Sequence, residues 1–153
     1  MNESDLGWLA GIIDGEGTIT LCEVHKVDRQ HLGFSVNVCV SSTSPKLIYR
    51  VMHLMEEMEL KPAIQLLKGK GKRKDAYQAR ITERTRIELF LLRISPYLVE
   101  KKEQAYWMLE YIKQRRLEGG QISSLCYSIA YKIRSLNTKQ GLTKELEGGE
   151  NGK

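Results

Sequence analysis

The segment from 33 to 42 alternates strictly between apolar and small polar side chains, and this pattern constrains the fold most strongly. Its apolar members are Phe34, Val36, Val38 and Val40, and its polar members are Ser35, Asn37, Cys39 and Ser41. A period of two is typical of a β-strand with one face in a core. The sequence therefore predicts an antiparallel sheet with one buried face and one small, polar, exposed face.

The elements expected around this segment give an α+β plan. Ser4 is predicted to cap a first helix, which Gly15 and Gly17 end. Ser44-Pro45, a capping side chain followed by proline, predicts a second helix start. Strands are expected at 18–28, 33–42, 63–68 and 76–82, and later helices at about 84–94, 100–117 and 123–137. The order α-β-β-α-β-β-α-α-α predicts helices packed on one face of the sheet.

Length and composition set further limits. The 153 residues of the chain are enough for one domain with a core, which is expected at 1–137. A polar, flexible tail is expected at 138–153. No apolar run reaches the roughly 18 residues that cross a membrane, so no membrane partner is expected. Three scattered cysteines favour free thiols and a reducing compartment.

The charge distribution points to an anionic partner. The chain carries a net charge of +5, and residues 68–86 hold eight basic and two acidic side chains, a local charge of +6. Lysines and arginines on a hairpin would bind phosphates, and a two-stranded ribbon fits the major groove of DNA. The same residues are also compatible with a solvated, lysine-rich edge turn that prevents aggregation, so charge leaves both interpretations open.

The first helix ends by presenting an acid. Gly7, Ala10, Gly11 and Asp14 share one helix face, where small residues would let a second helix approach closely. Glu16 follows between two glycines. Two such helices side by side would bring two carboxylates, suited to Mg²⁺, to one centre for phosphodiester hydrolysis. By its acid and glycine content alone, residues 14–17 could equally be a turn into the first strand.

The full segment Leu9-Ala-Gly-Ile-Ile-Asp-Gly-Glu-Gly17 resembles the signature of the LAGLIDADG homing endonucleases, and the element order over about 4–137 is also similar. This resemblance implies the α-β-β-α-β-β-α fold of that family, with a saddle-shaped antiparallel sheet facing DNA and helices on the other face. The single copy of the motif resembles the branch whose members act as homodimers. Maturases and some DNA-binding regulators share the motif.

The resemblance also implies roles for individual residues. Glu16 would bind the metal, Gly15 would offer a backbone carbonyl, and Asp14 would be more structural. Lys101 matches a lysine that follows a Pro-aromatic-Leu element, with Lys102 as the alternative. This lysine would polarise the nucleophilic water or stabilise the transition state. An exposed cation in a helix's first turn is the other interpretation of Lys101. Relatives often have a glutamine after the second strand, where this chain has Ser41-Ser42-Thr43, so Ser42 is the candidate for holding water.

Strand alternation and family analogy predict a DNA-facing set of side chains. Its members are Thr20, Cys22, Lys26, Ser35, Asn37, Cys39, Lys68, Lys70, Gln78 and Arg80. The predicted interface of the homodimer consists of Gly7, Ala10, Gly11 and Asp14.

These features favour a Mg²⁺-dependent enzyme, with Mn²⁺ or Ca²⁺ substituting in binding, that cuts both strands of a long pseudo-palindromic DNA target as a homodimer. The expected setting is intracellular, in a prokaryotic cytoplasm or in an organelle, as an intron-encoded product. One alternative is an RNA-splicing maturase or DNA-binding regulator with the same fold. The other is a protein whose first helix only mediates dimerisation, with no role in nucleic-acid binding.

Overall fold

The computed structural model describes residues 1–25 and 31–150, with side chains described for 1–24 and 33–138. The elements are α1 (Glu3–Glu16), β1 (Gly17–His25), β2 (His31–Ser42), α2 (Pro45–Glu57), β3 (Ala63–Leu67), β4 (Ala76–Ile81), α3 (Arg84–Ile94), the 3₁₀ turn η1 (Ser95–Tyr97), α4 (Lys102–Glu118) and α5 (Ser124–Glu150). The predicted α+β class and element order are confirmed. Within the described part of the chain, no helix is long and apolar enough to cross a membrane.

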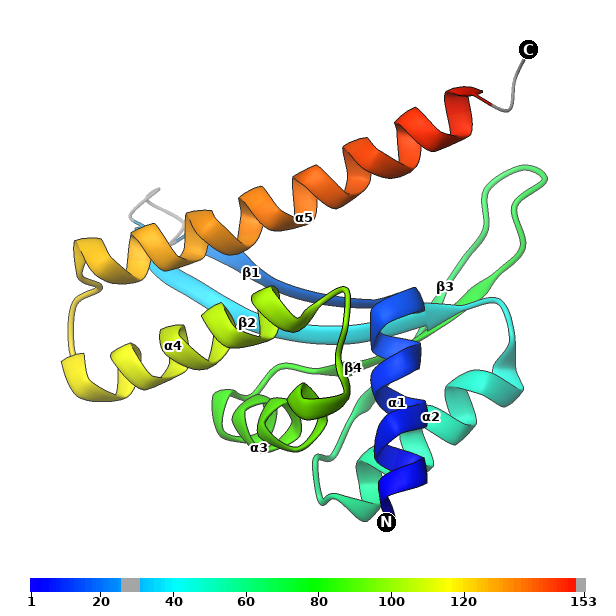
Figure 1. The fold of residues 1–153 in the computed structure, drawn as a ribbon, viewed down its shortest axis with the longest axis horizontal. Coiled ribbons are helices and arrows are strands. Elements are labelled where there is room, and N and C mark those ends of the chain that lie inside the picture. Colours follow the sequence, from blue (N-terminus) through cyan, green and yellow to red (C-terminus); the bar gives the residue numbers. More distant parts are fainter. Residues whose placement is uncertain (26–30, 151–153) are drawn as a thin grey trace.

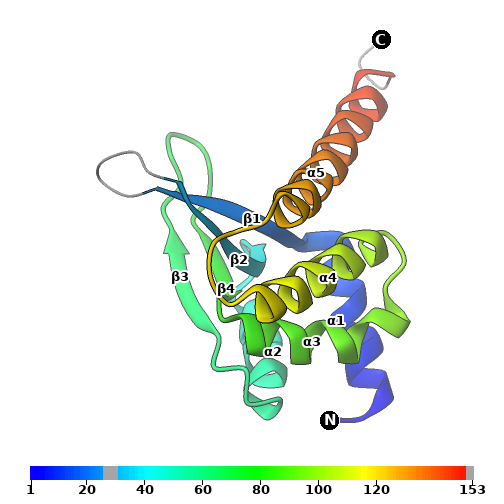
Figure 2. The same cartoon turned by 90° about the vertical axis from the view of Figure 1, so that its left-hand side faces the viewer.

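The four strands form one antiparallel sheet in the order β1-β2-β4-β3. Helices α1 to α4 lie against one face of this sheet, while the long strands β1 and β2 curve across the molecule (Figures 1 and 2). The core is therefore a layer between the sheet and the helices. Its strand contribution is fully or almost fully buried and consists of Ile19, Leu21, Val36, Val38, Val40, Ala79 and Ile81.

Local sequence explains where α1 begins and ends. Asn2, rather than Ser4 as predicted, is the N-cap: its side chain accepts from the Asp5 amide, and the Asp5 carboxylate accepts in return from the Asn2 amide. At the other end, the buried Gly17 enters β1 directly. A Cβ at Gly17 would lie 2.7 Å from the Ile13 backbone, so this tight junction requires glycine.

Helix α5 lies along the edge strand β1 (Figure 1). The Asn137 side chain donates to the Ile19 carbonyl over 3.0 Å, and Arg134 pairs with Glu23. The predicted end of this helix at about 137 was wrong, because α5 continues to Glu150. Polar and glycine-rich composition indicated a loop there, but such residues can extend a helix that packing has already nucleated. The flexibility of 138–153 stays a prediction.

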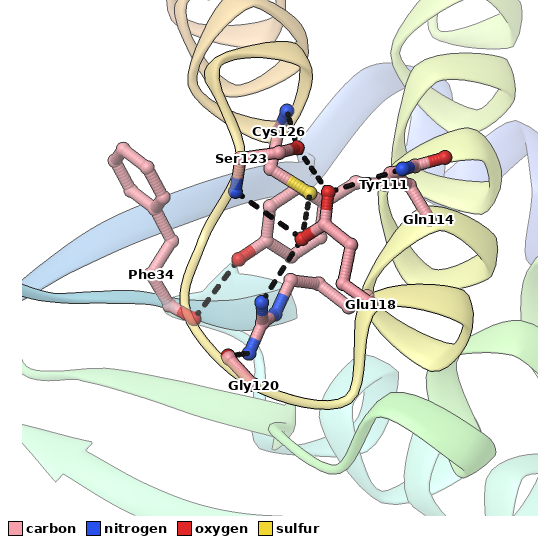
Figure 3. A network of polar contacts seen from close by, with 8 residues as sticks. Phe34, Tyr111, Gln114, Glu118, Gly120, Ser123 and Cys126 are labelled. Atoms are coloured by element: carbon pink, nitrogen blue, oxygen red, sulfur yellow. Dashed lines mark hydrogen bonds and ion pairs between the residues drawn. The ribbon is translucent and has the colours of Figure 1, made fainter.

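The turn between α4 and α5 is held by the carboxylate of Glu118 (Figure 3). It accepts from the Ser123 hydroxyl and amide, from Gln114 Nε2 at 3.0 Å, and from Arg115 Nη1 at 3.1 Å. The hydrogen bonds from Ser123, which contribute most, and from Gln114 favour the charged form, so they lower the pKa of Glu118 from 4.5 to about 2. Gly119 ends α4 in the left-handed conformation, with φ of 63°.

We expect Glu118→Gln to lower the Tm by several degrees at neutral pH, since the amide cannot accept from all these donors. A carboxyl group with a lowered pKa stabilises the fold above its unfolded pKa, near 4.5, and this contribution disappears as the pH falls towards about 2. Thermal melts between pH 5 and 2 should therefore show a flatter pH dependence for the variant. The exposed Glu56→Gln is the matched control, and equal slopes for both variants would contradict the prediction.

Candidate functional site

Asp14, in the last turn of α1, ties this helix to the start of α4. Its Oδ2 accepts from the Val99 amide at 2.8 Å, and its Oδ1 accepts from the Lys101 amide at 2.9 Å. Lys101 is the N-cap of α4, where the helix dipole favours a negative charge. The two carboxylate contacts therefore fix the 99–101 segment against the end of α1.

The Lys101 side chain lies at the same junction. Its Nζ donates to the Asp14 backbone carbonyl over 2.5 Å, and the residue is only 9% exposed. The alternative that Lys101 is an exposed cation is therefore excluded. Lys102, its neighbour, is exposed, so the structure brings Lys101 rather than Lys102 to the end of α1.

Glu16 closes α1 one residue after Gly15, and both are exposed. Among the described residues, no hydrogen bond or ion pair engages the Glu16 carboxylate. The last helical bond of α1 runs from the Gly17 amide to the Ile13 carbonyl, so the carbonyls of residues 14 to 16 have no partner within the helix. The Lys101 ammonium contacts the Asp14 carbonyl, and the exposed Glu16 carboxylate follows two residues later at the same end of α1. Carboxylate and carbonyl oxygens are the ligands that suit a hard divalent cation.

The described side chains of one chain do not form a metal-binding cluster. In the part of the chain that the structure describes, no three His, Cys, Asp or Glu residues gather to hold a metal. Ser42 lies at the end of β2, where its hydroxyl accepts from the Ser44 amide at 3.1 Å. Its strand parity puts it on the helix side of the sheet, with Val40.

The interface face predicted for α1 needs correction. Ala10 is fully buried within its own chain, and both Asp14 carboxylate oxygens bond to the 99–101 segment. A Cβ on the half-buried Gly7 would lie 4.0 Å from Tyr97. The prediction was wrong for Ala10 and Asp14, because the chain's own 97–101 segment and core cover this face. Of the four, Gly11 is exposed, and a Cβ there would meet no atom within 4 Å.

The exposed side of α1 is instead a stripe about a quarter of a turn away, which shares Gly11 with the predicted face. It consists of Ser4, Trp8, Gly11 and Gly15, spaced by three or four residues. Trp8 is 39% exposed, which is unusual for so large an apolar side chain. The sequence pattern identified small residues on α1 but did not reveal which of its sides the 97–101 segment would cover.

Cross-strand pairing places the polar side chains of three strands on the outer face of the sheet. Cys22 pairs with Ser35, and Thr20 with Asn37. Cys39 pairs with Arg80, and Ser41 with Gln78. Since paired residues point to the same side, the predicted members of β1, β2 and β4 share one surface, opposite the helices. Gln78 Nε2 donates to the Ser41 hydroxyl at 3.0 Å.

Two members of this outer surface are less accessible than predicted. Cys39 is 7% exposed, and burial raises the pKa of its thiol. Asn37 is half-buried, its Oδ1 has no partner among the described residues, and its Nδ2 contacts Cys39 Sγ at 3.8 Å. Cys39 and Asn37 are therefore the less accessible members of the outer face. Lys68 and Lys70 are exposed on the β3–β4 hairpin, where Lys68 Nζ lies 3.5 Å from Asp75 Oδ2, whereas Lys26 lies outside the described residues.

The structure adds three polar residues that the prediction left out. Thr18 pairs with Cys39, Ser41 pairs with Gln78, and Gln65 pairs with Gln78 from the other side. The alternation of β1 and β2 already puts Thr18 and Ser41 on this face, because each lies two residues from a predicted member of the same strand. Gln65 could not be found this way, because every residue of β3 is exposed and its pattern carries no inward-facing signal.

Residues 3–95 match a family model described as a LAGLIDADG-like domain. The chain belongs to the LAGLIDADG family. No curated protein matches its sequence. The matched range includes α1, the Glu16 junction and all four strands, and it ends in η1, so that Lys101 lies beyond it.

Solved homing endonucleases share the fold of this LAGLIDADG chain. The homing endonuclease I-CvuI, crystallised with its target and calcium, matches with a TM-score of 0.62 and 21% identity, covering 92% of this chain and 84% of that one. The archaeal intron-encoded I-Vdi141I in complex with DNA gives 0.67 and 15%, covering 88% and 84%. I-TnaI gives 0.61 and 14%, covering 88% and 96%.

Proposed function

We propose that this LAGLIDADG protein is a site-specific endonuclease that hydrolyses both strands of a long pseudo-palindromic DNA target as a homodimer. One observation carries the proposal: Lys101 Nζ lies 2.5 Å from the Asp14 carbonyl, which puts a buried ammonium two residues from the unpartnered carboxylate of Glu16. Phosphodiester hydrolysis uses an acid that holds a metal and a cation that stabilises charge on the phosphate.

The proposed cofactor is Mg²⁺, held by the Glu16 carboxylate and the Gly15 carbonyl. These oxygens are accessible and of the kind that hard cations bind, so the residues fit the ion. When bound, the metal would activate water and act as a Lewis acid. Lys101 would stabilise negative charge on the phosphate, and Ser42 would help to hold water. Crystals of I-CvuI with DNA were obtained with calcium and with magnesium, which supports a divalent cation here.

A second copy of the chain would complete the site. The motif occurs once, and the chain covers 84% of I-CvuI but only 42% of I-SmaMI, so it corresponds to about half of the latter. We propose that the exposed stripe of α1, with Gly11 at its centre, packs against its symmetry mate and brings the two Glu16 residues together. An isologous dimer then presents two equal sheets, which explains a pseudo-palindromic target.

The outer face of the sheet is the proposed DNA-binding surface. Arg80, Gln78, Asn37 and Thr20 offer hydrogen-bonding groups for base edges in the major groove. Lys68 and Lys70 on the hairpin would contact phosphates, and Lys26 is proposed to do the same from the β1–β2 connection. I-CvuI has been solved with its target and I-Vdi141I with DNA, which supports a DNA-binding role for this surface.

A two-stage experiment tests the function. A random double-stranded DNA library is first selected for binding in Ca²⁺, and the bound pool is then transferred to Mg²⁺ or to EDTA. We expect double-strand breaks at one enriched, pseudo-palindromic sequence in Mg²⁺ and none in EDTA. Enrichment of a sequence that stays intact in Mg²⁺ would contradict cleavage and favour a DNA-binding regulator. Binding confined to structured intron RNA would favour a maturase.

A further inference from the structure

Two polar side chains are buried on one face of α4, in a region where the helix otherwise contributes apolar side chains to the core. Lys101 is 9% exposed and Gln104 is 1% exposed. A spacing of three residues puts them on the same side of the helix. Ala105 and Met108, which continue this side, are fully buried, whereas Lys102 is exposed. Gln104 therefore lies one helical turn inward from Lys101.

The Gln104 amide is not satisfied within the protein. Its Nε2 is buried and has no hydrogen-bond partner among the described residues. A side-chain amide nitrogen carries two N–H donors, and burying them without an acceptor costs free energy that an apolar side chain would not. Filling the space at position 104 does not require an amide, because a methionine side chain has the same length and carries no N–H donors. Since no described group of the protein accepts from this amide, an ordered water molecule is the simplest partner for it.

Polar groups around Lys101 could share a water molecule with the buried Gln104 amide. The Lys101 ammonium contacts the Asp14 carbonyl, and the Asp14 carboxylate contacts the Lys101 amide. A water molecule bound among such groups commonly makes about three hydrogen bonds, and it could accept one from Gln104. Such a water would connect the buried amide to the junction that carries Glu16.

We propose that Gln104 is a positioning residue for the cleavage reaction: through a buried water molecule, it holds the Lys101 side chain at the end of α1. The inference rests on the proposed function for its catalytic consequence, but the proposed link through water between Gln104 and Lys101 does not depend on it. Gln104 touches neither DNA nor metal in this scheme. Its loss should therefore affect turnover and not target affinity.

The test is Gln104→Met, which keeps the length of the side chain and removes the donors. We expect kcat for target cleavage to fall about 10- to 100-fold, with the Kd for the target in Ca²⁺ unchanged and the Tm unchanged or higher. Gln104→Asn, which keeps a shorter amide, should restore part of the activity. Gln114→Met is the matched control on the same helix: its amide donates to Glu118, so it should lower the Tm and leave kcat unchanged.

A readout independent of cleavage separates this inference from the proposed function. In protein with ¹³C,¹⁵N-labelled lysine, the side-chain NMR signals of Lys101 should shift in Gln104→Met and stay in place in Gln114→Met. Unmoved Lys101 signals, or an unchanged kcat in Gln104→Met, would overturn the role of Gln104. If the wild-type chain cuts no DNA at all, the proposed function fails, while the Lys101 signals still decide whether Gln104 positions that lysine.

Discussion

Replacing Glu16 by glutamine should reduce the rate of double-strand cleavage by about a thousandfold or more, equivalent to roughly 4 kcal/mol of transition-state stabilisation. An amide retains the size of the side chain but lacks the charge that holds a divalent cation. Because Glu16 is exposed and its carboxylate makes no hydrogen bond or ion pair with a described residue, the substitution should leave the Tm unchanged. The rate is measured on a linear duplex that carries the selected target, at saturating Mg²⁺.

Target affinity distinguishes a lost metal ligand from a damaged DNA-binding surface. The Kd of Glu16→Gln for the target should stay within a few-fold of wild type, since the outer face of the sheet is untouched. Glu56→Gln, an exposed acid on α2, is the matched control and should cleave at the wild-type rate. Cleavage by Glu16→Gln at an undiminished rate would rule out Glu16 as the metal-binding acid.

Local patterns were sufficient to predict most of the fold. The alternation in β2 gave both faces of the sheet, because a strand's two sides are fixed by parity alone. Ser44-Pro45 gave the start of α2, where Ser44 accepts from the Leu47 amide. The end of α5 was missed because glycine and charge content report the preference of an isolated segment. Packing along β1 holds this helix at Asn137.

The candidate site was predictable where function depends on a linear motif and unpredictable where it depends on tertiary packing. The motif and the Pro-aromatic-Leu element selected Glu16 and Lys101, which the structure brings to one junction. The interface face was partly wrong because helical periodicity gives the sides of α1 but not their neighbours. The 97–101 segment is over 80 residues away in sequence and covers the side with Asp14. The burial of Gln104 also depends on tertiary packing, so the sequence pattern did not reveal it.

The exposed stripe of α1 leads to the second large effect, which we expect for Gly11→Leu. Within one chain the substitution should be favourable, since a Cβ at this position meets no atom within 4 Å and leucine is a better helix former than glycine by up to about 1 kcal/mol. Between two chains it should be severely unfavourable, because close approach of two helix backbones requires small side chains. The variant should therefore be a folded monomer that cuts neither strand of the target.

Separate measurements of folding and of dimerisation distinguish a folded Gly11→Leu monomer from an unfolded protein. Analytical ultracentrifugation should show a wild-type dimer and a Gly11→Leu monomer over the same concentration range, while far-ultraviolet circular dichroism shows equal helix content. Lys113→Leu adds an exposed leucine to α4, away from the stripe, and should remain a dimer that cleaves normally. A Gly11→Leu protein that still dimerises and cuts both strands would show that the two Glu16 residues meet through another surface. Because the described residues of each chain offer one unpartnered carboxylate at this junction, that of Glu16, loss of the dimer and loss of cleavage should occur together.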